Sequence, residues 1–162
     1  MAADPDRALE LPQLLLQLGR GRRTGAVLGA AAAGTGPVVL LIGDVALAYD
    51  LGALASAARL GLALTIVLLN NDGGGIFSFL LVAREHDAFE EHVATPHGLD
   101  FARAAALYGC AYARADDPAA LRAALASAGD GVTLIEVRTD RDENVRIHRD
   151  LFEAVGSALA AA

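Results

Sequence analysis

The alternation of short apolar runs with helical segments constrains the fold of this chain more than any other feature. Residues 37–43, 62–69 and 132–138 are apolar runs of strand length, "PVVLLIG", "LALTIVLL" and "VTLIEVR". Runs of this kind are typical of strands that are buried on both faces. Strands that alternate with helices indicate a parallel sheet. The sequence therefore predicts an α/β fold with a doubly wound, mostly parallel sheet and helices on both faces.

Helix start and stop signals lie between these runs. We predict a helix over 50–60 with Asp50 as its N-cap, and a helix that begins at Asp100 and stops at Gly109. The segment "DDPAALRAALASAG" has an aspartate cap followed by Pro118 at the first helical position. A short strand around "CAYAR" is expected between the last two helices.

A further helix is predicted at the end of the sequence, over residues 144–160, with Asp142 or Asn144 as its cap. Its large apolar residues recur at helical spacing. We therefore expect a buried face made of Leu151, Phe152, Val155 and Leu159.

The first part of the chain has a weaker pattern. The stretch "ALELPQLLLQLGRGRRTGAVLGAAAAGTG" is compatible with two short helices or with a strand and a helix. We divide the chain into residues 1–24, a segment whose structure the pattern does not define, and residues 25–162, one folded domain.

Composition excludes several classes of function. The net charge of −7 argues against a nucleic-acid partner, because phosphate binding requires concentrated Lys and Arg. No stretch reaches the roughly 18 uninterrupted apolar residues of a membrane span. The first residues run from acidic to basic, the reverse of a secretory signal, so a soluble, cytoplasmic protein is expected. Cys110 is the single cysteine, which rules out an internal disulfide; we expect it to be buried.

Polar side chains follow two of the apolar runs at the point where each strand ends. Asp44 follows the first run, and Asn70 and Asn71 follow the second. In a parallel sheet of this type, ligands bind outside the carboxyl ends of the strands. Carboxylate and carboxamide oxygens suit Mg²⁺, and the carbonyl of Gly73 is a candidate third ligand. Free N–H groups of the Gly73 to Gly75 turn are expected to help bind a diphosphate.

The same residues carry a resemblance to a known family. "GD" at residues 43–44 and "NN" at 70–71 have the spacing of the diphosphate-binding motif of thiamine diphosphate enzymes. The flanking segments "NNDGGGIFSFL", "FEEHVATPHGLDFARAAALYG" and "IEVRTDRDENVRIHRDLFEAV" resemble the C-terminal domain of 2-succinyl-5-enolpyruvyl-6-hydroxy-3-cyclohexene-1-carboxylate synthases of menaquinone biosynthesis. The resemblance runs from about residue 37 to 156.

The resemblance implies roles for individual residues. Asp44, Asn71 and Gly73 correspond to the ligands of Mg²⁺, for which Mn²⁺ is an alternative. The cofactor-binding residues implied are Asp44, Asn71, Gly73, Gly74, Gly75 and Ile76. Phe77 and Leu80, together with Ile76, correspond to an apolar wall beside the cofactor and the isochorismate site. Leu81 stands where the family tends to have proline.

The resemblance also implies an activity: a transferase that decarboxylates 2-oxoglutarate and adds the succinyl unit to isochorismate. The family's chain is several times longer. Its N-terminal domain binds the aminopyrimidine of the cofactor and supplies the activating glutamate, and this sequence has no counterpart of that domain or of the central one. We therefore expect the single chain to be incomplete as an enzyme, without catalytic residues of its own. The chain is then a fragment or a truncated gene product, or a partner completes the site. As partners we expect a homo-oligomer or a pyrimidine-binding partner chain.

Two alternatives stay open from the sequence. One is a non-catalytic module that keeps the fold for oligomerisation or weak cofactor binding. The other is an NAD-type dinucleotide-binding domain, since "GRGRRTG" at residues 19–25 is a loose glycine fingerprint with Asp44 about 20 residues further on. Such a fingerprint requires a clear strand before its first glycine, and the preceding "LPQLLLQL" contains Pro12 and two glutamines. The four histidines show no paired spacing, and a turn role is favoured for His97.

Overall fold

The computed structural model describes residues 14–16 and 23–160, and within these ranges five parallel strands form one sheet. The strand order is β1-β2-β3-β5-β4. The strands are β1 Leu14–Leu16, β2 Val39–Gly43, β3 Leu64–Asn70, β4 Ala111–Arg114 and β5 Val132–Arg138. Every pairing is parallel, so the carboxyl ends of all five strands lie at one edge of the sheet.

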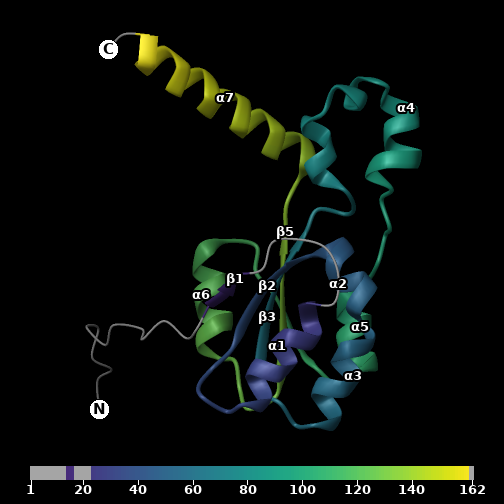
Figure 1. Ribbon diagram of the computed structural model, residues 1–162, viewed down its shortest axis with the longest axis vertical. Coiled ribbons are helices and arrows are strands. Elements are labelled where there is room, and N and C mark those ends of the chain that lie inside the picture. Colours follow the sequence, from purple (N-terminus) through teal and green to yellow (C-terminus); the bar gives the residue numbers. More distant parts are fainter. Residues whose placement is uncertain (1–13, 17–22, 161–162) are drawn as a thin grey trace.

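Helices connect the strands and cover both faces of the sheet. The α-helices are α1 Arg23–Ala32, α2 Asp44–Asp50, α3 Gly52–Arg59, α4 His86–Phe89, α5 Phe101–Leu107, α6 Pro118–Ala126 and α7 Arg141–Ala160. Two 3₁₀ helices, η1 Gly75–Phe79 and η2 Leu81–Arg84, and a π-helical turn, η3 Glu90–Ala94, lie in the long connection after β3. Figure 1 shows α6 on one side of the sheet and α2, α3 and α5 on the other. The predicted doubly wound α/β fold is confirmed.

The core lies between the sheet and the layer that contains α3 and α5. Alternate residues of the strands point into it, as expected for a side-chain period of two. The buried cluster includes Leu40, Ile42, Ile66, Leu68 and Leu134 from the strands, and Leu54, Ala57, Phe101 and Ala105 from the helices. Burial of each large apolar side chain contributes roughly 1.5–3 kcal/mol. This packing fixes the strand ends from which the polar loops emerge.

Helix caps follow the sequence in two cases and depart from it in two. The carboxylates of Asp100 and Asp117 accept N–H groups of α5 and α6, as predicted. Asp50 does not cap a helix, because the chain is already helical from Asp44. Its carboxylate instead accepts the Thr24 hydroxyl at 2.7 Å and thereby ties α1 to the end of α2. At the start of α7 the cap is Asp140, two residues before Asp142 and four before Asn144, and it accepts the Glu143 N–H at 2.8 Å.

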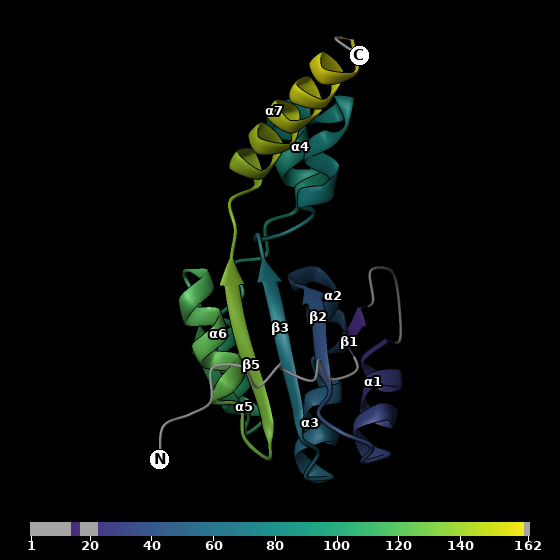
Figure 2. The same cartoon turned by 90° about the vertical axis from the view of Figure 1, so that its left-hand side faces the viewer.

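Helix α7 contradicts one prediction. Its apolar stripe has the predicted helical spacing, but the expected burial is wrong. Leu151, Phe152, Val155 and Leu159 are 57%, 71%, 56% and 73% exposed. The reason is the direction of the helix, which projects away from the sheet (Figures 1 and 2). Buried Val145 and an edge-to-face contact between the rings of Phe79 and His148 anchor its first turns.

The beginning of the described chain consists of a strand and a helix, one of the two predicted arrangements. β1 pairs with β2, with Leu14 opposite Val39, and α1 follows. The proposed division at residue 24 stays a prediction, although β1 belongs to the same sheet as the later strands. Among the described helices, none combines the length and the apolar character that a membrane span requires.

Candidate metal centre

Two strand ends bring the predicted ligands together. β2 ends at Gly43, which lies opposite Leu69 of β3. Asp44 is the first residue of α2, and Asn71 follows the last residue of β3. β2 and β3 are thus hydrogen-bonded neighbours in the sheet. Asp44 and Asn71 therefore emerge at the same edge of the sheet, where parallel α/β folds bind ligands.

The Asp44 carboxylate is buried and held by backbone donors. Only 3% of this residue is exposed. Its Oδ1 accepts the Val45 N–H at 2.7 Å, and its Oδ2 accepts the N–H groups of Asn71 at 3.2 Å and Gly73 at 2.9 Å. Hydrogen bonds from N–H donors to a carboxylate are among the stronger ones in proteins. Asp44 thus joins the end of β2 to the loop after β3.

Asn71 carries the clearest sign of a missing partner. Its Oδ1 is the one buried side-chain polar atom among the described residues without a hydrogen bond. Leaving such an atom unpaired costs about 1–3 kcal/mol, so a native structure has a reason for it. A side-chain carbonyl oxygen is a ligand that hard cations prefer. The amide fits here because residue 75 is glycine: a Cβ on Gly75 would lie 2.5 Å from Asn71 Nδ2.

The glycine turn packs closely against the segment after η3. Gly73 has a φ of +131°, and a Cβ there would lie 2.3 Å from the Ala94 carbonyl oxygen, so only glycine is tolerated. The prediction of free N–H groups is wrong. Gly73 donates to Asp44, Gly74 donates to the Ala94 carbonyl at 2.7 Å, and Gly75 donates to the Gly73 carbonyl at 3.0 Å. A carbonyl has two lone pairs, so that of Gly73 retains one.

His97 lies in the site, which the sequence did not predict. Its Nε2 is 3.1 Å from Asp44 Oδ2. The Leu99 N–H donates to Nδ1 at 3.0 Å, so the ring proton is assigned to Nε2, facing Asp44. Asp72 Oδ1 is 3.3 Å from Nδ1, but it already accepts the N–H groups of His97 at 3.1 Å and Gly98 at 2.8 Å. The favoured turn role is therefore only part of the function of this residue.

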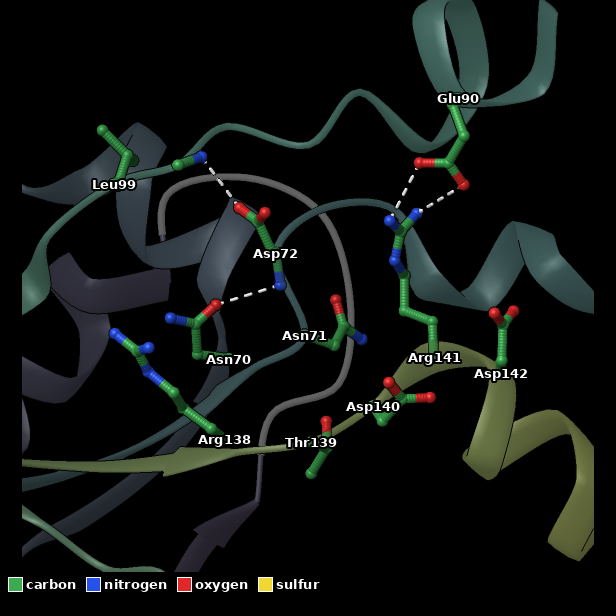
Figure 3. A pocket seen from close by; sticks show the side chains of 11 residues that line it. Asn70, Asn71, Asp72, Glu90, Leu99, Arg138, Thr139, Asp140, Arg141 and Asp142 are labelled. Carbon is green, nitrogen blue, oxygen red and sulfur yellow. Dashed lines mark hydrogen bonds and ion pairs between the residues drawn. The ribbon is translucent and has the colours of Figure 1, made fainter. Parts of the chain in front are cut away.

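Asn70 supports the loop from behind. Its Oδ1 accepts the N–H of Asp72, which has a φ of +58°, at 3.0 Å. Its Nδ2 donates to Glu136 Oε1 at 2.7 Å (the Asn70 to Asp72 bond is drawn in Figure 3). The side chain of Asn70 therefore connects the turn that carries Asn71 to the neighbouring strand β5.

Glu136 is a buried carboxylate with three donors. It is 1% exposed and also accepts Arg138 Nε at 2.8 Å and the Tyr112 hydroxyl. Burial alone would raise the pKa of Glu136, but the hydrogen bonds from Tyr112, Arg138 and Asn70 outweigh burial and lower it below its usual value. Burial and the bond to Glu136 raise the pKa of Tyr112 to about 12. We did not predict this network, although a glutamate within the apolar run 132–138 was a signal for it.

A cavity of about 440 Å³ opens beside the loop, between the ends of β3 and β5 and the start of α7. Figure 3 shows Asn71, Asp72 and Arg138 on its walls. Arg141 lines it too, but both of its terminal nitrogens are engaged by the Glu90 carboxylate, at 3.3 and 2.9 Å. This ion pair holds the start of α7 against η3.

The predicted apolar wall lies on the segment directly after the glycine turn. Ile76 and Phe77 are in η1, and Leu80 joins η1 to η2. Ile76 is 74% and Leu80 53% exposed, so these side chains present apolar surface. Their role beside a cofactor stays a prediction.

Two other sequence candidates have outcomes here. Cys110 is buried as predicted, and burial raises the pKa of its thiol. Most of the glycine fingerprint at residues 19–25 lies outside the described residues. Within the described ranges there is no cluster of three or more His, Cys, Asp or Glu side chains suited to a metal. The set at Asp44, Asn71 and Gly73 is of another kind, with one carboxylate and two carbonyl oxygens, which is the chemistry that Mg²⁺ accepts.

Comparison with known proteins agrees with this geometry. Residues 5–137 match the family described as thiamine pyrophosphate enzyme, C-terminal TPP binding domain; thiamine pyrophosphate is thiamine diphosphate under another name. The 2-succinyl-5-enolpyruvyl-6-hydroxy-3-cyclohexene-1-carboxylate synthase of Myxococcus xanthus is 48% identical over 135 residues, which are 82% of this chain and 23% of that protein. The synthase of the same name from Chloroflexus aurantiacus is 49% identical over 136 residues, 83% of this chain and 23% of that protein.

Solved structures show the same relationship. The thiamine diphosphate-dependent 4-hydroxybenzoylformate decarboxylase of Rhodococcus jostii superposes with a TM-score of 0.62 at 32% identity, over 71% of this chain and 22% of that one. The chain thus spans less than a quarter of the length of these relatives. The resemblance seen in the sequence is confirmed: the chain belongs to the thiamine pyrophosphate enzyme family, as a C-terminal thiamine pyrophosphate-binding domain.

Proposed function

We propose that the edge of the sheet at Asp44, Asn71 and Gly73 binds Mg²⁺, with Mn²⁺ as an alternative, and through it the diphosphate of thiamine diphosphate. One observation carries this proposal: Asn71 Oδ1 is buried without a partner next to a loop that also bonds the Asp44 carboxylate. A cation accounts for this unpaired oxygen. The side-chain oxygens of Asp44 and Asn71 and the free lone pair of the Gly73 carbonyl supply the ligands.

The glycines let the turn between the metal ligands and the apolar wall pack closely. A Cβ on Gly74 would lie 2.8 Å from the Phe77 ring, and one on Gly75 would lie 2.5 Å from Asn71 Nδ2. Ile76, directly after them, begins the wall. Because the N–H groups of these glycines are engaged within the chain, the cation rather than free amides provides most of the attraction for the diphosphate. When bound, thiamine diphosphate supplies the electron sink that allows a 2-oxo acid to lose carbon dioxide.

The biological reaction proposed is the one that the resemblance implies: decarboxylation of 2-oxoglutarate and transfer of the succinyl unit to isochorismate in menaquinone biosynthesis. Identity of 48–49% over more than four fifths of this chain supports it. The contribution of this chain is to bind and orient the diphosphate end and to shield it with Ile76, Phe77 and Leu80. A pyrimidine-binding domain on a partner chain contributes the activating glutamate. The exposed apolar stripe of α7 supports such an assembly.

The dinucleotide-binding alternative is disfavoured by the position of Asp44. In such domains the acidic residue accepts the ribose hydroxyls. Here the Asp44 carboxylate accepts four N–H groups of its own chain, from Val45, Asn71, Gly73 and His97.

Calorimetric titration tests the proposal. The chain should bind thiamine diphosphate only when Mg²⁺ is present, and should not bind NAD⁺. Asp44→Ala should abolish the Mg²⁺-dependent binding while the far-ultraviolet circular dichroism of the protein stays the same. Binding of thiamine diphosphate that is indifferent to Mg²⁺ and to Asp44 would contradict the metal site. A non-catalytic module would bind the cofactor but gain no activity when a pyrimidine-binding domain of the family is added.

A further inference from the structure

The two oxygens of the Asp44 carboxylate have unequal surroundings. Oδ2 accepts three donors: the N–H groups of Asn71 and Gly73 and the Nε2–H of His97. Within residues 14–16 and 23–160, Oδ1 accepts the Val45 N–H alone. A carboxylate oxygen has about two lone-pair positions. Oδ2 is therefore saturated, and Oδ1 keeps an open position.

We propose that His97 is a positioning residue for the metal ligand Asp44: its Nε2–H holds Oδ2 so that Oδ1 is presented to the cation. This inference rests on the proposed function. Ligating carboxylates are commonly oriented by hydrogen bonds from residues that do not touch the metal, and loss of such a partner typically lowers metal affinity about 10–100-fold.

The His97 ring is itself held in place, as a positioning residue requires. The Leu99 N–H occupies Nδ1, which fixes the tautomer with its proton on Nε2. The Asp72 carboxylate accepts the backbone N–H groups of His97 and Gly98. The imidazole ring packs edge-to-face on the Phe101 ring, with the ring centroids 5.8 Å apart. The side chain is 16% exposed. Its donor therefore reaches Asp44 with little loss of rotamer freedom when the site binds a ligand.

Two substitutions separate the donor function from the rest of the residue. In His97→Gln, the amide nitrogen can take the place of Nε2 and donate to Asp44, whereas the contact with Leu99 is lost. In His97→Asn, the amide oxygen can take the place of Nδ1 and accept the Leu99 N–H, whereas the donor to Asp44 is lost. The apparent Kd for Mg²⁺, measured by calorimetry at a fixed concentration of thiamine diphosphate, is the main readout.

The proposal predicts that His97→Asn raises the Kd for Mg²⁺ about 10–100-fold, and that His97→Gln stays within about threefold of the natural chain. Equal weakening in both variants would indicate a merely structural residue and overturn the proposal. Tighter Mg²⁺ binding in His97→Asn would overturn it as well, since the imidazole would then compete with the cation.

Amide hydrogen exchange in the ligand-free protein gives a readout that needs no cofactor. If His97 holds Asp44, the Gly73 N–H, which donates to Asp44, should exchange faster in His97→Asn than in His97→Gln. Equal exchange in the two variants would contradict the proposal. If the natural chain shows no Mg²⁺-dependent binding, the proposed function fails, and the exchange experiment alone decides whether His97 holds Asp44.

Discussion

Replacement of Glu136 by leucine tests whether the buried network behind the loop stabilises the fold. Glu136 is the common acceptor for Asn70, Arg138 and Tyr112. Leucine has a similar size but accepts no hydrogen bond, so all three donors lose their partner. Glu136→Gln removes the charge but keeps one oxygen, which can still accept Asn70 and Arg138. Its amide nitrogen then faces the Tyr112 hydroxyl, which can turn to accept from it.

The expected magnitude follows from the exposure of each donor. Asn70 is 7% exposed, and its unpaired amide should cost about 1–3 kcal/mol. The Arg138 side chain is 53% exposed and can bond to water, so its loss adds about 1 kcal/mol. Tyr112 is half-buried and adds less. We expect Glu136→Leu to lower the free energy of unfolding by about 2–4 kcal/mol and Glu136→Gln by about 1 kcal/mol.

Urea unfolding followed by circular dichroism at neutral pH measures both values. The pKa of Glu136 is lowered by folding, so its ionised form stabilises the protein above the ordinary carboxyl pKa of about 4.3, and this contribution is lost as the pH falls through the lower, folded pKa. The difference between the natural chain and Glu136→Leu should shrink over that range. A cost below about 0.5 kcal/mol, or Gln as damaging as Leu, would refute the argument. Glu153→Gln, at an exposed position of α7, is the control and should leave the midpoint unchanged.

Three further predictions concern the turn, the projecting helix and a cap. Gly75→Ala should weaken Mg²⁺-dependent thiamine diphosphate binding about tenfold or more, because the new Cβ would lie 2.5 Å from Asn71 Nδ2. Gly129→Ala is the neutral control, since a Cβ there would have no atom within 4 Å. Equal affinities of the two variants in calorimetry would refute this prediction. Phe152→Glu should lower self-association in sedimentation velocity and leave the unfolding midpoint unchanged, since Phe152 is 71% exposed; unchanged association would contradict a role for the α7 stripe. Asp100→Ala should lower the free energy of unfolding by about 1 kcal/mol through loss of the α5 N-cap, and a value near zero in urea titration would show that the cap is replaced by water.

Much of the fold could be predicted because the apolar runs and helix-start residues in the sequence coincide with the strands and helices of the structure. The apolar run 132–138 coincides with β5, and the run 62–69 differs from β3 by one or two residues at each end. Pro118 begins α6 as expected. The prediction of Asp50 as an N-cap was wrong, because α2 already begins at Asp44 and Asp50 is its last residue. Its carboxylate accepts the hydroxyl of the distant residue Thr24 instead. An aspartate before an apolar segment does not by itself show whether its side chain caps a helix or bonds to a distant residue.

The site was predicted in part for a similar reason. Asp44 and Asn71 could be placed together because each follows the carboxyl end of a strand, and the two strands are parallel. His97 could not be placed, because its contact with Asp44 spans 53 residues and depends on the path of the long connection after β3. The engaged glycine N–H groups also depend on that connection, which brings Ala94 to the turn. The burial expected for Phe152 failed because helical periodicity identifies an apolar face but not what covers it.

The location of the bound cation decides whether Asp44, Asn71 and Gly73 form the metal site. Mn²⁺ is paramagnetic and broadens nuclear magnetic resonance signals near its site, and a chain of 16.6 kDa is suited to amide spectra. With thiamine diphosphate present, substoichiometric Mn²⁺ should broaden the amide signals of Val45 and of residues 71–75, and excess Mg²⁺ should restore them. The signals of Gly61 and Gly131, at the opposite end of the strands, should stay sharp. Broadening centred elsewhere, or none that Mg²⁺ reverses, would contradict the assignment of Asp44, Asn71 and Gly73 as the metal site.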